Sequence, residues 1–197
     1  AIITYLFNII MMQLVGEHCV AAITILLYGQ FLFNAFYLGF TIGISPIVGF
    51  QYGAGDKQKL RNIYHTSFSF VAVSSVFMAV IAIVLSPTIV TIFTDDPATY
   101  ELAAVGFRLF AINFLFSGIS ITSSGFFTAL SNGTISAVIS FCRTLGFIVL
   151  SLLILPKFLG ITGAWIAIPV AEFCTLLVTG VMHFVYFWKP GIRNYLR

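Results

Sequence analysis

The sequence predicts an all-α protein, a polytopic bundle of about six membrane-spanning helices, and three observations indicate that fold class. Charged residues make up 8% of the chain and apolar residues 60%, whereas soluble proteins have about 25% and 45–50%. From Cys19 to Gln51 the chain runs 33 residues without Asp, Glu, Lys, Arg or His, more than the roughly 20 that cross a bilayer. Such runs are continuously apolar rather than alternating, which disfavours barrel strands and leaves helices.

Gly, Pro and charged residues divide the sequence into six predicted helices. The first run, up to Leu14, is too short to span the bilayer, so we expect the chain to begin inside a helix and to be a fragment. The later half of the second helix carries Gly39, Gly43, Pro46 and Gly49, which favour a kink or a break. The predicted helices cover residues 2–14, 19–52, 62–85, 98–130, 134–155 and 161–188.

Positive charge in the connections predicts the orientation of these helices. Six Lys or Arg residues follow the second and sixth helices, at Lys57, Lys59, Arg61, Lys189, Arg193 and Arg197. The opposite connections hold only Lys157. The positive-inside rule therefore places the connection after the second helix, and the C-terminus, in the cytoplasm. The net charge of +3 comes from scattered residues that form no basic stripe, so the sequence argues against a nucleic-acid partner.

The sequence offers no residues for catalysis, a metal or a cofactor. It shows no Ser-His-Asp, Cys-His, zinc-ligand or paired-carboxylate arrangement. Cys19, Cys142 and Cys174 lie in apolar segments without ligand spacing, which is typical of buried small hydrophobic residues. His183 lies near the end of the sixth helix, where we expect an interfacial side chain rather than a ligand. We therefore expect no enzyme and no cofactor.

Two charged residues lie deep in predicted helices, Arg143 in the fifth and Glu172 in the sixth. At 1.5 Å per residue, both are about 13.5 Å from the cytoplasmic side of a bilayer core about 30 Å thick. Charges at such depth usually face a bundle interior and have a partner. The shared depth predicts an Arg143–Glu172 ion pair between antiparallel neighbours. It is either a proton- or cation-linked switch or a packing clamp.

Polar residues recur at helical spacing on two further helices. The positions i, i+4, i+7 and i+11 are Gln30, Asn34, Tyr37 and Thr41 on the second helix and Asn113, Ser117, Ser120 and Ser124 on the fourth. One interpretation is that each face lines a water-filled cavity that binds an amphipathic solute, aided by the 16% of aromatic residues. The other is hydrogen bonding between membrane helices by small polar residues.

Several motifs resemble the MATE (multidrug and toxic compound extrusion) family of exporters. Residues 39–55 read GFTIGISPIVGFQYGAG and precede a basic turn, which is similar to the end of a long helix of that family. Further matches, in family order, are SGFFTALSNG at 124–133, SFCR at 140–143, LP at 155–156, GITGAW at 160–165 and PVAE at 169–172. They look like its last three helices, most similar to a MepA-like bacterial branch.

The resemblance implies one lobe of a twelve-helix secondary transporter with two six-helix lobes around a central cavity. Residues 1–197 would be the C-terminal lobe, and its partners would be the missing N-terminal lobe, the lipid bilayer and a small amphipathic or cationic substrate. The implied activity is drug efflux across a bacterial plasma membrane by antiport with Na⁺ or H⁺. Some members carry coupling carboxylates in the first and fourth helices of this lobe, but here those apolar cores hold no acidic residue. That cation site therefore does not transfer to this chain.

Two other classes of function compete with drug efflux. A lipid-linked oligosaccharide flippase of the same superfamily would favour several basic residues in the cavity, where the sequence offers only Arg143. A structural or enzymatic membrane subunit would need partner motifs or catalytic residues, and the sequence displays neither.

Overall fold

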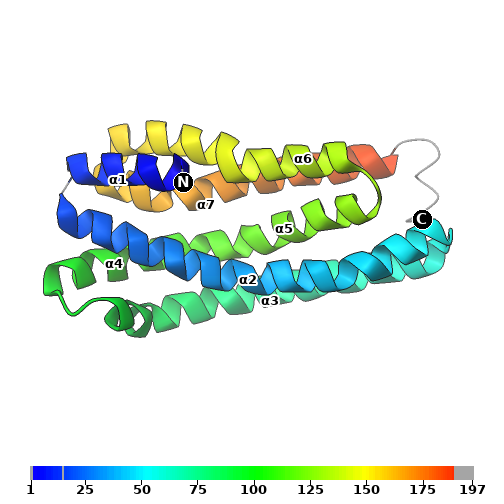
Figure 1. Ribbon diagram of the computed structural model, residues 1–197, viewed down its shortest axis with the longest axis horizontal. Coiled ribbons are helices and arrows are strands. Elements are labelled where there is room, and N and C mark those ends of the chain that lie inside the picture. Colours follow the sequence, from blue (N-terminus) through cyan, green and yellow to red (C-terminus); the bar gives the residue numbers. More distant parts are fainter. Residues whose placement is uncertain (1, 15, 189–197) are drawn as a thin grey trace.

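The protein is an all-helical bundle, as the sequence predicts. The computed structural model describes residues 2–14 and 16–188, and within those ranges every regular element is a helix (Figure 1). The basic residues Lys189, Arg193 and Arg197, which contribute to the predicted orientation, lie outside the described residues. The elements are α1 (Ile2–Leu14), α2 (Glu17–Gly53), α3 (Lys57–Phe93), α4 (Pro97–Phe110), η1 (Ala111–Asn113), α5 (Phe114–Ala129), α6 (Gly133–Phe141), η2 (Cys142–Gly146) and α7 (Phe147–Trp188).

These elements form six runs that alternate in direction along the bundle (Figure 1). The segments α4, η1 and α5 make one run, and α6, η2 and the first part of α7 make another. Gly160 divides α7, since its backbone has φ 57° and ψ −134° and the chain turns back there. Four stretches of the described chain are long and apolar enough to cross a membrane: Glu17–Gly53, Lys57–Phe93, Pro97–Ala129 and Gly133–Tyr186. The last of these reverses at Gly160, so it provides two crossings.

Several helices extend past their predicted ends. The predicted helix 62–85 is α3, which begins at Lys57, after the N-cap Asp56, and continues through Pro87 to Phe93. Likewise, α2 runs unbroken through Pro46, and the predicted connection 156–160 is reduced to Gly160. Proline is tolerated in membrane helices because their surroundings pair the freed backbone groups, so placing Pro87 and Pro156 in connections was wrong.

The charged residues gather at the two ends of the bundle. We call one the acidic end, because the start of α2, the connection before α4 and the start of α4 carry Glu17, Asp95, Asp96 and Glu101. The opposite, basic end carries Asp56, Lys57, Lys59 and Arg61. Long apolar helices with most of their charge at the ends are the pattern of a bundle that spans a bilayer.

Helix α5 lies at the centre of the bundle and contacts α2, α3, α6 and α7. Glycines allow the helices to approach closely. An added Cβ at Gly118 would lie 2.6 Å from the ring of Tyr37, and one at Gly29 would lie 2.5 Å from the ring of Phe107. Small residues at helix interfaces are typical of membrane bundles, where association depends on packing. This packing encloses Tyr37 and Thr41 of α2 and most polar side chains of α5.

Candidate functional site

One cavity brings together polar side chains from three elements. Its volume is about 290 Å³, and its polar lining comes from α2, η2 with its Arg143 and Thr144, and α7. The polar residues are Gln30, Asn34, Arg143, Thr144 and Glu172, and the apolar ones are Ile3, Leu27, Phe31, Leu38 and Ile148. We call this space the polar pocket. A space with an apolar wall and a few convergent polar groups is the usual form of a small-molecule site.

Arg143 projects from a widened helical turn. Residues Cys142–Gly146 form a π-helix, η2, between α6 and α7. Within it the hydroxyl of Thr144 donates a 2.7 Å hydrogen bond to the carbonyl of Ser140, four residues earlier. Such back-bonding competes with the regular helical ladder, and short π-helical turns often occur at functional sites. The chain thus departs from α-helical geometry at its buried cation.

Arg143 and Glu172 lie in contact inside the bundle. Arg143 Nε and Glu172 Oε1 are 3.0 Å apart, with 17% and 1% of the side chains exposed. The Nε–H does not point at an acceptor with hydrogen-bond geometry, so the contact is an ion pair rather than an aligned hydrogen bond. Buried pairs of this kind need not stabilise a protein, because desolvation of both ions offsets their attraction. The pair therefore calls for a functional explanation.

Two buried oxygen acceptors of the polar pocket have no donor within the described chain. They are Glu172 Oε2 and Asn34 Oδ1, and both residues line the pocket. Buried polar atoms are nearly always paired, and leaving an acceptor unsatisfied costs about 1–3 kcal/mol. A bound proton, cation or N–H donor would remove this cost. No group of His, Cys, Asp and Glu side chains that could hold a metal occurs among the described residues.

Five other residues of the two predicted stripes lie away from the polar pocket. All five are buried inside the bundle: Tyr37, Thr41, Asn113, Ser117 and Ser120. Thr41 lies 3.4 Å from Thr122 across the α2–α5 interface, and the amide of Asn113 donates to the carbonyl of Phe110 at 2.6 Å. They are enclosed because α2 and α5 pack directly on each other. The structure therefore places these five residues outside this pocket, and the Thr41–Thr122 contact is an instance of the helix-joining alternative.

Hydroxyl groups also join α6 to α5. The Oγ of Ser124 lies 2.9 Å from that of Ser136 and 2.7 Å from that of Ser140. Thr128 Oγ1 contacts Ser136 Oγ at 2.7 Å. These hydrogen bonds position α6, which leads into the η2 turn that carries Arg143. They explain why Ser124 belongs to the polar stripe of its helix without contributing to the pocket.

His183 is half-buried and contacts two other helices, which the sequence did not predict. Its Nδ1 lies 3.1 Å from Tyr64 Oη and its Nε2 lies 3.0 Å from Ser123 Oγ, which ties α7 to α3 and α5. Both partners are far away in sequence, so its distance from the helix end gave no signal of this contact.

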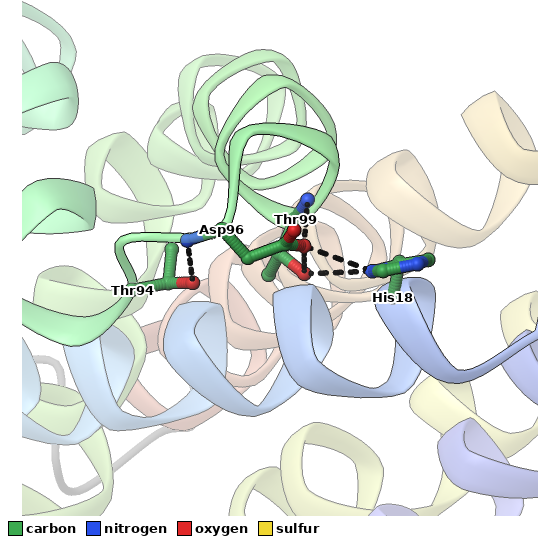
Figure 2. A network of polar contacts seen from close by, with 4 residues as sticks. All are labelled: His18, Thr94, Asp96 and Thr99. Carbon is green, nitrogen blue, oxygen red and sulfur yellow. Dashed lines mark hydrogen bonds and ion pairs between the residues drawn. The ribbon is translucent and has the colours of Figure 1, made fainter.

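A second polar cluster lies at the acidic end (Figure 2). Asp96 Oδ2 accepts hydrogen bonds from the Thr99 hydroxyl at 2.6 Å and the Thr99 N–H at 2.9 Å. His18 Nδ1 lies 2.9 Å from the same oxygen. This cluster caps α4 and connects it to the start of α2. Sequence reasoning placed Asp96 in a connection but did not predict this contact.

Long apolar helices with an ion pair buried between two of them define a polytopic membrane protein. The family model MatE matches residues 1–153, so the chain belongs to the MATE family, whose members are secondary transporters and not enzymes. It is 27% identical over 143 residues to multidrug and toxin extrusion protein 1 of Homo sapiens, covering 70% of this chain and 24% of that protein. The same protein of Pongo abelii matches to the same extent.

Solved structures show the same fold. An outward-facing multidrug resistance MATE family transporter has a TM-score of 0.85 at 19% identity over 93% of this chain and 42% of its own. A MOP superfamily transporter from Pyrococcus furiosus has a TM-score of 0.85 at 19% identity, over 96% of this chain and 44% of its own. The MATE transporter of Vibrio cholerae in its bent form has a TM-score of 0.84 at 18% identity, over 98% of this chain and 43% of its own. The chain thus spans less than half of each relative.

Proposed function

We propose that residues 1–197 form the C-terminal six-helix lobe of a transporter that exports amphipathic or cationic compounds by antiport with H⁺ or Na⁺. Membership of the MATE family supports export, and the chain covers 42% of the length of a solved MATE family transporter. The missing N-terminal lobe would supply the other wall of the solute pathway. Rocking of one lobe against the other around a fixed site is the general mechanism of such transporters.

The polar pocket carries the proposal, because it combines an ion pair with two unpaired acceptors near the middle of the helices. Glu172 Oε2 and Asn34 Oδ1 can accept hydrogen bonds from the ammonium or N–H group of a solute. Gln30 and Thr144 line the same space, and Phe31 and the aliphatic residues offer an apolar wall.

The pairing of Glu172 with Arg143 gives the pocket a means of coupling. With Glu172 ionised, the two charges cancel and Oε2 is available to a cationic solute. Binding of H⁺ or Na⁺ at Oε2 would neutralise the carboxylate and leave the charge of Arg143 uncompensated, which repels a cation. Solute and coupling ion would then compete for one carboxylate, as antiport requires. In this proposal Glu172 is the switch, and the fixed positive charge of Arg143 determines whether the pocket is neutral or positive in each state.

We further propose that the basic end and the C-terminus face the cytoplasm of a bacterial plasma membrane. Lys57, Lys59 and Arg61 support this orientation, because short cytoplasmic connections are enriched in Lys and Arg. The acidic end would then face outward.

Ethidium efflux by the full-length transporter in proteoliposomes tests the proposed function. Sodium and pH gradients are imposed separately, on the wild type and on Glu172→Gln. We expect one gradient to accelerate wild-type efflux at least about tenfold, or 1.4 kcal/mol of coupling, and the variant to lose this acceleration. Glu101→Gln removes an exposed carboxylate at the acidic end and should behave as the wild type. Unchanged coupling in Glu172→Gln with intact expression would leave the pair as a packing clamp, and wild-type vesicles that export no ethidium under either gradient would contradict drug export.

A further inference from the structure

A second cavity lies between α1 and the first part of α7, at the acidic end of the bundle. Its volume is about 400 Å³. Seven of its lining residues are apolar: Leu6, Ile9, Ile10, Leu14, Leu152, Leu153 and Pro156. The other two are Gln13 and Lys157. We call this space the lateral groove. It shares no lining residue with the polar pocket.

The two polar residues lie at one end of the lateral groove. Both α1 and residues 147–159 run toward the acidic end (Figure 1), so Gln13 and Lys157 lie near that end. Leu6 precedes Gln13 by seven residues, and Leu152 precedes Lys157 by five. At 1.5 Å per residue, the apolar part reaches about 7–10 Å deeper along the helices. The groove is therefore amphipathic along the membrane normal.

The exposure of its residues shows that the lateral groove is open at the side of the bundle. Leu14 is 38% exposed and Leu153 is 45% exposed, whereas Leu152 is 1% exposed and forms the floor. Gln13 and Lys157 are both exposed. No carboxylate lies within ion-pair distance of Lys157 in the part of the chain that the structure describes, although the other charges near this end are mostly acidic.

We propose that the lateral groove binds an anionic phospholipid from the leaflet at the acidic end. Its phosphate lies at Lys157 and Gln13, and the first segment of one acyl chain lies along Leu6, Ile10 and Leu153. The oxygens of a phosphodiester accept hydrogen bonds from an ammonium such as that of Lys157 and from an amide N–H such as that of Gln13. The lining of the groove includes no acidic residue to repel the phosphate. Basic pockets between membrane helices recognise lipid head groups by this chemistry. A soluble anion would gain nothing from the apolar floor.

The test measures binding of short-chain fluorescent phosphatidylglycerol to the full-length transporter in detergent, with phosphatidylcholine as the neutral comparator. We expect the wild type to bind phosphatidylglycerol more tightly than phosphatidylcholine. Lys157→Gln should lose about fivefold in affinity for phosphatidylglycerol, which is the contribution of one basic side chain near an anionic surface. Lys157→Arg should recover that affinity. Arg108→Gln removes another exposed cation, from α4, which contributes nothing to the groove, and should bind as the wild type does. Leu153→Trp, which fills the groove, should weaken both lipids.

Four results would overturn this proposal. Equal binding of both lipids to the wild type would show that the groove does not select charge. An equal loss in Lys157→Gln and Arg108→Gln would assign the effect to overall charge. Displacement of the lipid by millimolar inorganic phosphate would identify a site for free anions. If the missing lobe covers the groove, Leu153→Trp will leave lipid binding unchanged, which also contradicts the proposal. None of these readouts depends on transport, so the proposal stands or fails apart from the proposed function.

Discussion

Gly118 determines how closely α5 approaches α2 and α3. A Cβ at this position would lie 2.6 Å from the ring of Tyr37 and 2.7 Å from Ser75 Oγ, and neither side chain has room to move because Tyr37 is fully buried and Ser75 is 1% exposed. Overpacking a close-packed interior costs about 1–3 kcal/mol.

We therefore expect Gly118→Ala to lower the melting temperature of the full-length transporter in detergent. Gly39→Ala on α2 is the matched control, since nothing lies within 4 Å of its added Cβ, and it should melt at or slightly above the wild-type temperature. Equal melting of the two variants would contradict the packing described for α5.

Asp96 links stability to pH at the acidic end, outside the membrane-spanning helices. The pKa of its carboxyl is lowered from 3.8, first by the hydrogen bond from the Thr99 hydroxyl, then by the Thr99 N–H, with the charge of His18 contributing less. The pKa is lower in the folded than in the unfolded protein. Its contribution to stability is therefore complete above pH 3.8 and is lost as the pH falls through the lowered value.

Asp96→Ala should melt below the wild type at pH 7, and this difference should shrink as the pH falls below 3.8. The measurement is thermal unfolding in detergent across that range. Asp95→Ala removes the same charge from the adjacent position and should have little effect. A difference for Asp96→Ala that stays constant with pH would show that lost packing, not the capping carboxylate, is responsible.

At the scale of elements, Gly160 produces the reversal that separates the last two crossings. Its φ of 57° with ψ of −134° is a backbone conformation that L side chains rarely adopt. We expect Gly160→Ala to cost about 1–3 kcal/mol and to lower the yield of folded protein. Gly180→Ala, within the second part of α7 and with no neighbour within 4 Å of its Cβ, is the control. If Gly160→Ala expresses and melts as the wild type does, this turn does not need glycine.

The sequence predicted the number and order of the helices better than their ends. A long, continuously apolar run forms a helix in a bilayer, so all six runs are present at the predicted places. Helix ends depend on caps such as Asp56 and on how far a helix extends into the interface, and composition does not determine either. Pro46 and Pro87 lie within helices because a packed membrane bundle compensates for the missing N–H.

At the scale of the whole molecule, depth in the membrane was the most informative sequence signal for the site. It placed Arg143 and Glu172 at one level, and their side chains lie 3.0 Å apart. Helical spacing was less informative, because it groups Gln30 and Asn34 with Tyr37 and Thr41 without showing where α5 covers the face. Thr144 was not anticipated, although it lines the pocket next to Arg143 in the π-helical turn.

The central claim is that the polar pocket opens to the solute pathway of the complete transporter. It is tested by labelling Asn34→Cys with a membrane-impermeant thiol reagent, after replacement of Cys19, Cys142 and Cys174. Leu177→Cys is the control, because Leu177 is 57% exposed and lies about 140° around α7 from Glu172. We predict that Asn34→Cys reacts and that ethidium slows its labelling, while Leu177→Cys stays unreactive. An Asn34→Cys that resists the reagent, or that reacts equally with and without ethidium, would contradict the account.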